Sequence, residues 1–237
     1  RYKKTFTDEL DNDVLPLLEH GKLRLELEYK AALEKVNRIG DLSLTSIFTD
    51  WKRIKLHEFL MLMEVRLKQG QIEDFILKIT PFMYELMLYY FSMVYHVNWD
   101  EFEKRTSVGP RTNMESFKEK HPQLYSSWHA HTKTPQFNEI QLSLNHMLHM
   151  LEDQPNVNSL LLKQLKDIRN IERKIRNKIA HEVVVLTEVE ICKSVNIKSL
   201  QSFLELIKAV FSTIMKPSKQ NKLIYDTINA YILDQIQ

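Results

Sequence analysis

Glycine, proline and cysteine are all scarce in this sequence. Its 237 residues include four glycines, seven prolines and one cysteine. So few glycines and prolines argue against a loop-rich β-sandwich and against a nucleotide-binding fold built on a glycine cradle. The single thiol, Cys192, excludes an internal disulfide, fits a reducing compartment, and is interpreted as buried and unreactive.

Long hydrophobic runs are also missing. The most apolar stretch, residues 82–97, is interrupted by Glu85 and is too short to cross a bilayer. No signal-peptide pattern follows Arg1, and because the chain does not open on Met we expect further residues, up to a whole domain, before it. These features predict a soluble, cytoplasmic protein with no membrane partner.

The residues that are abundant favour helix. Hydrophobic residues make up 43% of the chain and charged residues 27%, with Lys, Glu, Leu and Ile prominent among them. We therefore predict an all-α fold. The formal net charge of +2 does not by itself indicate a nucleic-acid partner, so that argument depends on local clusters of charge.

Three helices are expected in the first half of the chain, over residues 13–38, 42–68 and 72–97. Leucines alternate with charged residues over 23–27, which leaves a short strand open there. Pro81 should kink or divide the third helix. The many aromatic residues of that helix are interpreted as core or dimer contacts, although a platform for stacking bases is an alternative.

Residues 98–136 interrupt the helical pattern. They carry Gly-Pro, His-Pro and Thr-Pro pairs with polar residues between them, which indicates a long irregular connection or an insertion with short helices. Four more helices are expected after this segment, and four helices of such length make a bundle. They cover residues 138–151, 157–179, 188–215, with a break near Asn196, and 218–236.

The helix over residues 157–179 has two distinct faces. One is an apolar stripe at helical spacing, which should be buried; it consists of Leu161, Leu165, Ile168, Ile171, Ile175 and Ile179. Beside it runs a basic stripe of Lys166, Arg169, Arg173 and Arg176. Between Lys163 and Lys178 the sequence holds seven basic residues and two acidic ones. Such an excess would suit a phosphate backbone, although a solvated helix face is the commoner explanation.

The end of this helix carries side chains suited to phosphate chemistry, in the run Arg176-Asn177-Lys178-Ile179-Ala180-His181. RNA cleavage through its own 2′-hydroxyl needs a group that takes one proton and a group that gives another, and histidine titrates near neutrality. Arginine stays charged and donates two hydrogen bonds to phosphate oxygens. Because the nucleophile comes from the RNA, no metal and no cofactor is required.

The same run resembles the R-x4-6-H signature of HEPN ribonucleases of type III-A CRISPR systems, in the form Arg-Asn-x-x-Ala-His. Those proteins carry a CARF sensor domain, a helical linker domain and a HEPN domain. The resemblance implies a helical linker over residues 1–112 and a HEPN four-helix bundle over 113–237. The strand–helix alternation of a CARF sensor is missing, so the family's activator, a cyclic oligoadenylate, is expected to bind outside these residues.

The resemblance also assigns roles to individual residues. Arg176 and His181 become the catalytic pair in cleavage of single-stranded RNA, and Asn177 either orients the site or caps the helix. Lys178, Arg173 and Arg169 become candidate phosphate contacts, with solvated surface as the alternative for each.

The spacing of the catalytic pair predicts a homodimer. Residues five apart on a straight helix point about 140° from each other, so Arg176 and His181 of one chain do not face one phosphate. The β-branched run Val183-Val184-Val185 suggests that the helix ends near His181, which would free the histidine to turn. Alternatively, a two-fold axis brings the motifs of two chains together, as in the family.

A metal site is a competing hypothesis. His146, His149 and Glu152 recur at steps of three, and His129 and His131 lie before them. The apolar residues between them look instead like a packing helix, so we predict no functional metal.

Two other functions stay open on the sequence alone. The chain could be a HEPN ribonuclease toxin of a toxin–antitoxin pair, or a non-catalytic helical interaction module in which Arg176 and His181 match by chance. RNA cleavage that depends on His181 would separate the module from both enzymes.

Overall fold

The computed structural model describes residues 14–36, 48, 50–107, 109–132, 138–181, 187–217 and 224–236. These residues are mainly helical, with one small three-stranded sheet, so the predicted all-α class is confirmed. The described residues divide between two compact units. One is formed by the two ends of the chain, Arg1–Gln69 with Met215–Gln237, and the other is formed by the middle, Gly70–Ile214.

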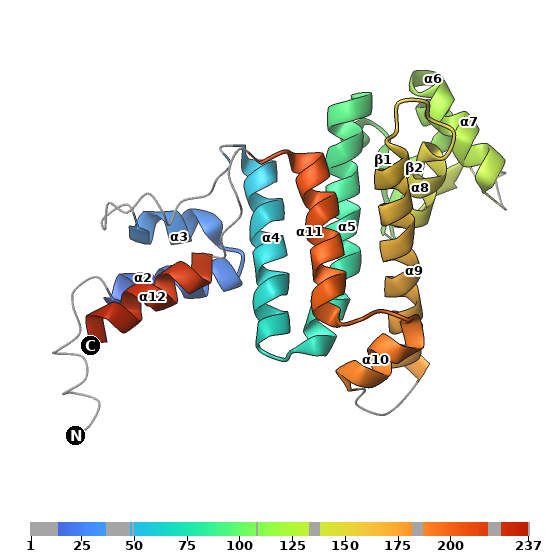
Figure 1. Ribbon diagram of the computed structural model, residues 1–237. Helices are drawn as coiled ribbons and strands as arrows, with labels where there is room; N and C mark the ends of the chain where they lie inside the picture. Colours follow the sequence, from blue (N-terminus) through green and yellow to red (C-terminus); the bar gives the residue numbers. More distant parts are fainter. Residues whose placement is uncertain are drawn as a thin grey trace. The chain divides into compact units, whose positions relative to one another are not determined.

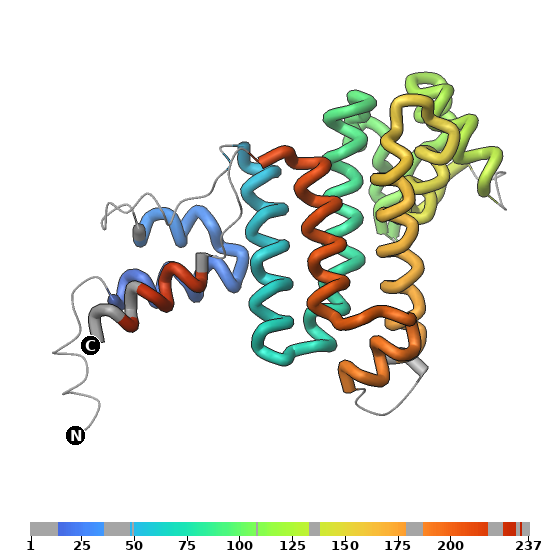
Figure 2. The backbone as a smooth tube through the Cα atoms, in the orientation of Figure 1, coloured from blue at the N-terminus to red at the C-terminus, as the bar shows by residue number. Residues whose placement is uncertain are grey.

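The first unit contains helices from both ends of the chain. They are α2 (Val14–Leu25), α3 (Tyr29–Val36), α4 (Trp51–Lys68) and α12 (Ile224–Ile236). Although far apart in sequence, α2 and α12 lie side by side (Figures 1 and 2). Lys68 Nζ lies 3.0 Å from Asp226 Oδ2, which ties α12 to the end of α4.

A polar cluster is buried among the apolar residues of the first unit. Arg24 is 0% exposed and Glu58 1%, and Arg24 Nε donates to Glu58 Oε2 at 2.8 Å. His20 Nδ1 lies 2.7 Å from the Ala32 carbonyl oxygen, so Nδ1 carries the proton and Nε2 accepts from Arg24 Nη1 at 3.2 Å. Because burial favours the neutral ring, the pKa of His20 is lowered.

The second unit contains the long helices α5 (Ile72–Tyr95), α9 (Ser159–His181) and α11 (Leu200–Met215), with the shorter α6 (Met114–Lys120), α7 (Pro122–His131), α8 (Leu144–Leu151) and α10 (Glu188–Val195). Helix α9 packs beside α5, α8 and α10 (Figure 1). Fully buried apolar side chains form the core of the second unit. They include Ile79, Phe82 and Leu86 of α5, Met147 and Met150 of α8, Ile168 and Ile175 of α9, and Ile207, Val210 and Phe211 of α11.

The segment predicted as an irregular connection contains a small sheet as well as the short helices α6 and α7. After the 3₁₀ turn η2 (Trp99–Glu101), strands β1 (Glu103–Thr106) and β2 (Gly109–Asn113) pair antiparallel, and β2 pairs with β3 (Glu139–Ile140). The helix predicted from residue 138 therefore begins later, at Leu144. Ser143 sets this start, because its side chain accepts a hydrogen bond from the His146 backbone N–H.

Other predicted boundaries are corrected as well. The helix expected over residues 13–38 is divided between α2 and α3 at Leu27, whose φ of 61° is left-handed. Residues 23–25 lie within α2, so the alternative of a strand there is wrong. Helix α5 continues through Pro81 without a division. The predicted break near Asn196 is confirmed, since this residue ends α10 with a left-handed φ of 57°.

Two further predictions concern the domain boundary and the place of the last helix. The boundary predicted between residues 112 and 113 falls within β2 and stays a prediction. The last predicted helix, α12, belongs to the first unit rather than to the middle of the chain. In the part of the chain that the structure describes, no helix is long and apolar enough to span a bilayer.

Candidate active site

Helix α9 presents the predicted catalytic segment. Asn158 caps its start, since Asn158 Oδ1 accepts from the backbone N–H groups of Leu160 and Leu161 at 2.9 and 3.2 Å. The predicted apolar stripe is buried at Leu161, Leu165, Ile168 and Ile175 and half-buried at Ile171. The side chain of its last member, Ile179, lies outside the described residues. Burial of this stripe fixes the rotation of α9 and therefore the direction of its basic face.

Arg176 is held at the surface by two contacts. Its Nη1 lies 3.3 Å from Glu172 Oε1, one turn earlier on α9, and donates to Thr80 Oγ1 of helix α5 at 3.2 Å. Its side chain is nevertheless 48% exposed. The guanidinium is therefore both anchored to the second unit and accessible to a phosphate.

Glu172 is the residue of this site that the sequence interpretation did not single out. It is 1% exposed and accepts hydrogen bonds from Thr80 Oγ1, Arg169 Nη1 and Arg176 Nη1. Arg169 is further fixed because its Nε donates to Asn145 Oδ1 at 2.8 Å. The available signal was spacing: Glu172 lies three residues after one arginine and four before another, which puts all three on one side of the helix.

The other predicted site residues lie on the same helix. Arg173 and Asn177 are exposed, and Lys178 is half-buried. Hydrogen bonds from Thr187 lower the pKa of the Glu190 carboxyl, and the charge of Lys178 adds to that effect. These positions keep their predicted roles as predictions.

His181 is the last residue of α9, but its side chain lies outside the described residues, as does the predicted β-branched run at 183–185. Arg176 and His181 therefore stand five positions apart on one helix, which turns them about 140° from each other. As the sequence predicts, these two positions of one helix do not face a single phosphate.

The histidines considered for a metal site are paired within the second unit instead. His149 Nδ1 lies 3.0 Å from Glu152 Oε1, and His131 Nε2 lies 2.9 Å from Asp153 Oδ2. The two imidazoles stack with centroids 6.2 Å apart and planes 17° apart. Lys166 Nζ lies 3.3 Å from Glu152 Oε2. The imidazoles, carboxylates and lysine of this cluster thus pair with one another, and the pairs link α7, α8 and α9.

The remaining two histidines do not join that cluster. His146 packs against the Trp128 ring edge to face at 6.3 Å, and burial lowers its pKa. His129 is exposed beside Tyr125. Among the residues described, no group of three or more histidine, cysteine or carboxylate side chains is arranged to hold a metal ion.

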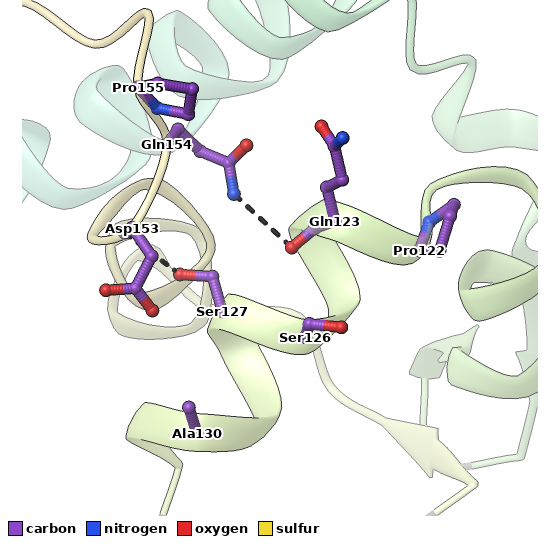
Figure 3. Close-up of a pocket in the computed structure, with 8 residues that line it drawn as sticks. All are labelled: Pro122, Gln123, Ser126, Ser127, Ala130, Asp153, Gln154 and Pro155. Atoms are coloured by element: carbon purple, nitrogen blue, oxygen red, sulfur yellow. Dashed lines mark hydrogen bonds between the residues drawn. The ribbon is translucent and has the colours of Figure 1, made fainter.

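An open groove of about 610 Å³ lies between α7 and the turn that follows α8 (Figure 3). Its lining is Pro122, Gln123, Ser126, Ser127, Ala130, Asp153, Gln154 and Pro155. Several of these groups bond to each other: Ser127 Oγ accepts from the Asp153 backbone N–H at 3.3 Å, and Gln154 Nε2 donates to the Gln123 carbonyl oxygen at 3.3 Å. None of the described residues that line this groove is a predicted site residue or a cation.

Known proteins resemble this chain in sequence and in fold. The family described as the Cas_Csm6 HEPN domain matches residues 47–233, which is well over half of the chain. A search of the curated proteins returns no match. Among solved structures, Enterococcus italicus Csm6 bound to cyclic hexa-2′-fluoro-hexa-dAMP is similar in fold, with a TM-score of 0.58 and 14% sequence identity.

That similarity covers 93% of this chain and 56% of the Enterococcus protein, so the chain spans little more than half the length of this relative. The matched range includes Arg176, Asn177 and His181, whose roles stay predictions. This chain belongs to the Csm6 HEPN domain family of type III CRISPR systems.

Proposed function

We propose that this chain is an endoribonuclease that cleaves single-stranded RNA without a metal, through attack of the RNA's own 2′-hydroxyl. The observation that carries the proposal is Arg176, on the basic face of α9: its guanidinium is anchored through Nη1, and its side chain is 48% exposed. Membership of the Csm6 HEPN family supports this chemistry over that of a non-catalytic module.

Each step of the reaction has a group suited to it. A base removes the 2′-hydroxyl proton, the oxygen attacks the adjacent phosphorus, and the 5′-oxygen leaves after it receives a proton. The products are a 2′,3′-cyclic phosphate and a 5′-hydroxyl. His181 serves as the base or the acid because imidazole exchanges protons near neutral pH. Arg176 stabilises the charge that develops on the phosphate oxygens.

The nearby residues take supporting roles in this proposal. Asn177 orients the site, and Arg173 and Lys178 contact flanking phosphates. Arg169 already uses Nε for Asn145 and Nη1 for Glu172, so it contributes positive charge more than a free pair of donors. A protein that draws its nucleophile from ribose should leave DNA intact.

The site is proposed to be composite, at the two-fold axis of a homodimer. On one α9 helix the two catalytic positions point about 140° apart. Two copies related by a two-fold axis offer the arginine of one chain together with the histidine of the other, or two of each, to a single phosphate. The protein is then active as a dimer.

Regulation and location complete the proposal. The similar Enterococcus protein has been solved with a cyclic hexa-adenylate analogue. We propose that a cyclic oligoadenylate activates this nuclease from a sensor domain outside these residues, as part of a cytoplasmic antiviral response. This hypothesis is preferred to that of a toxin because the match is to a CRISPR-associated family.

Cleavage of end-labelled single-stranded RNA in excess EDTA tests the proposal. The native chain is compared with His181→Ala and Arg176→Lys, and with the matched controls His129→Ala and Arg105→Lys, whose native side chains are exposed on other elements, α7 and β1. We expect the first change to lower the rate about 10²–10⁴-fold, as loss of a general acid or base does. Products should carry 2′,3′-cyclic phosphate ends, and both controls should keep the native rate.

The other outcomes separate the alternatives. Cleavage that disappears in EDTA would move attention to the paired histidines of α7 and α8. Activity that does not depend on protein concentration, in a chain that sediments as a monomer, would contradict the composite site. No cleavage even at high protein concentration, where dimers are favoured, would make the interaction module the leading hypothesis.

A further inference from the structure

We propose that Glu172 is a positioning residue for Arg176. The Glu172 carboxylate and the Thr80 hydroxyl accept hydrogen bonds from Nη1 of the guanidinium, and the edge formed by Nε and Nη2 is then oriented to bind phosphate. The inference rests on the proposed nuclease function and adds to it two residues that the HEPN signature does not contain. It concerns residues of the second unit alone.

The burial of Glu172 is the first observation. An ionised carboxylate that is 1% exposed is costly unless charged or hydrogen-bonding groups compensate it. Arg169 and Arg176 supply that compensation from either side along α9. One carboxylate shared between two guanidiniums leaves a single net positive charge, which is retained beside the exposed arginine. The cluster therefore stays attractive to an anion while its interior is neutralised.

The nitrogen that Arg176 uses is the second observation. The contacts to Glu172 Oε1 at 3.3 Å and to Thr80 Oγ1 at 3.2 Å both involve Nη1. Arginine donates side-on to phosphate through the pair formed by Nε and Nη2, which lies on the far edge of the guanidinium from Nη1. Holding Nη1 thus fixes the plane of the group without occupying the edge that suits a phosphate.

The third observation is that Thr80 comes from another helix. It lies on α5, whereas Glu172 and Arg176 lie on α9, and these helices pack against each other. Thr80 Oγ1 donates to Glu172 Oε1 and accepts from Arg176 Nη1, so it links the pair to the adjacent helix. A guanidinium tied to two helices keeps its orientation better than one held only by its own helix.

The same helix provides a matched control. Asp167 is the other acidic residue of the basic segment, and its side chain is exposed. Glu172→Gln and Asp167→Asn therefore remove one negative charge each, with nearly unchanged shape, from the same helix. If only the overall charge near the RNA mattered, both changes would have the same effect on cleavage.

Steady-state RNA cleavage gives the first result. We expect Glu172→Gln to lower kcat about 10- to 100-fold and to change KM by less than about threefold, as loss of a supporting residue does when a functional group loses its orientation. Asp167→Asn should stay within about twofold of the native kcat. Thr80→Val should lower kcat in the same direction, and Thr80→Ser should restore it, because serine keeps the hydroxyl.

A second readout does not depend on catalysis. The Arg176 Nε–Hε signal, assigned by its loss in Arg176→Lys, should have a high order parameter in the native chain and a lower one in Glu172→Gln and Thr80→Val. A merely structural role for Glu172 would change the melting temperature but leave this signal and the kcat of the folded variant unchanged. If Glu172→Gln does not fold, Thr80→Val decides the question.

The two proposals fail in different ways. A native chain that cleaves RNA, with Glu172→Gln equally active and Arg176 equally ordered, overturns the positioning role and leaves the nuclease proposal intact. A native chain that does not cleave RNA overturns the nuclease, while the Arg176 signal still tests whether Glu172 orders the guanidinium. An unchanged order parameter in both variants overturns the inference in either case.

Discussion

Acid should destabilise the first unit through His57. This side chain is 4% exposed on α4 and packs edge to face against Phe48 at 5.5 Å. Burial, with a smaller contribution from the positive charge of Arg24, lowers the pKa of His57 from 6.5 to about 4. In the unfolded chain the ring takes up a proton near pH 6.5, so falling pH favours unfolding.

The sign and size of the effect follow from that difference. A histidine with a depressed folded-state pKa contributes stability that is complete above about pH 6.5 and is lost as the pH falls toward about 4. The full difference between 6.5 and about 4 corresponds to about 3.4 kcal/mol, at about 1.4 kcal/mol for each pKa unit. About 2 kcal/mol of this should already be lost at pH 5.

Urea denaturation between pH 5 and pH 8 measures this loss. His57→Phe keeps an aromatic ring against Phe48 but removes the titrating nitrogens, so its free energy of unfolding should fall less on acidification, by about 2 kcal/mol at pH 5. Trp51, which contacts Tyr29 in the same unit, reports the transition by fluorescence. His129→Ala, at an exposed histidine, is the control. Identical pH dependence in the native chain and in His57→Phe would refute the reasoning.

Three further predictions concern stability and reactivity. Arg24→Met should lower the free energy of unfolding, measured by urea denaturation, by about 3–5 kcal/mol, because it leaves the buried Glu58 carboxylate uncompensated. The control Lys22→Met removes an exposed cation and should change this free energy by less than about 1 kcal/mol. Equal effects of the two substitutions would contradict the assigned role of burial. Thr187→Ala should cost about 1 kcal/mol in the same assay, since it removes the capping box with Glu190, and no change would show that α10 does not depend on its cap. Burial raises the pKa of the Cys192 thiol, so it should react with a disulfide reagent at pH 8 far more slowly in the native chain than in urea; equal rates would show that the thiol is accessible.

The sequence predicted well those features that depend on local periodicity. Helix α9 and its buried stripe follow from apolar residues repeating every three or four positions, a pattern with no competing interpretation as a strand. The break at Asn196 was also predicted, and asparagine is one of the few residues that adopt a left-handed conformation readily. The same conformation at Leu27 gave no signal, because leucine rarely adopts it.

The features that were missed depend on contacts between distant residues. Strand β1, Glu103–Thr106, is exposed along its whole length, so it has no alternation of polar and apolar residues to reveal it. From the sequence alone, Glu172 is interpreted as one more charged residue on a solvated helix face. Its spacing from Arg169 and Arg176 is a local signal, but its contact with Thr80, 92 residues earlier in the chain, is not contained in any local pattern.

The division of the chain into units has a consequence for synthesis on the ribosome. The first unit combines Arg1–Gln69 with Met215–Gln237, so the whole middle unit is synthesised between its two parts. The middle unit can fold as one domain, whereas α2 can pack against α3 early but against α12 only after the middle unit has been synthesised. Until α12 has left the ribosome, the first unit is therefore incomplete, and its earlier part is the one exposed to chaperones and proteases.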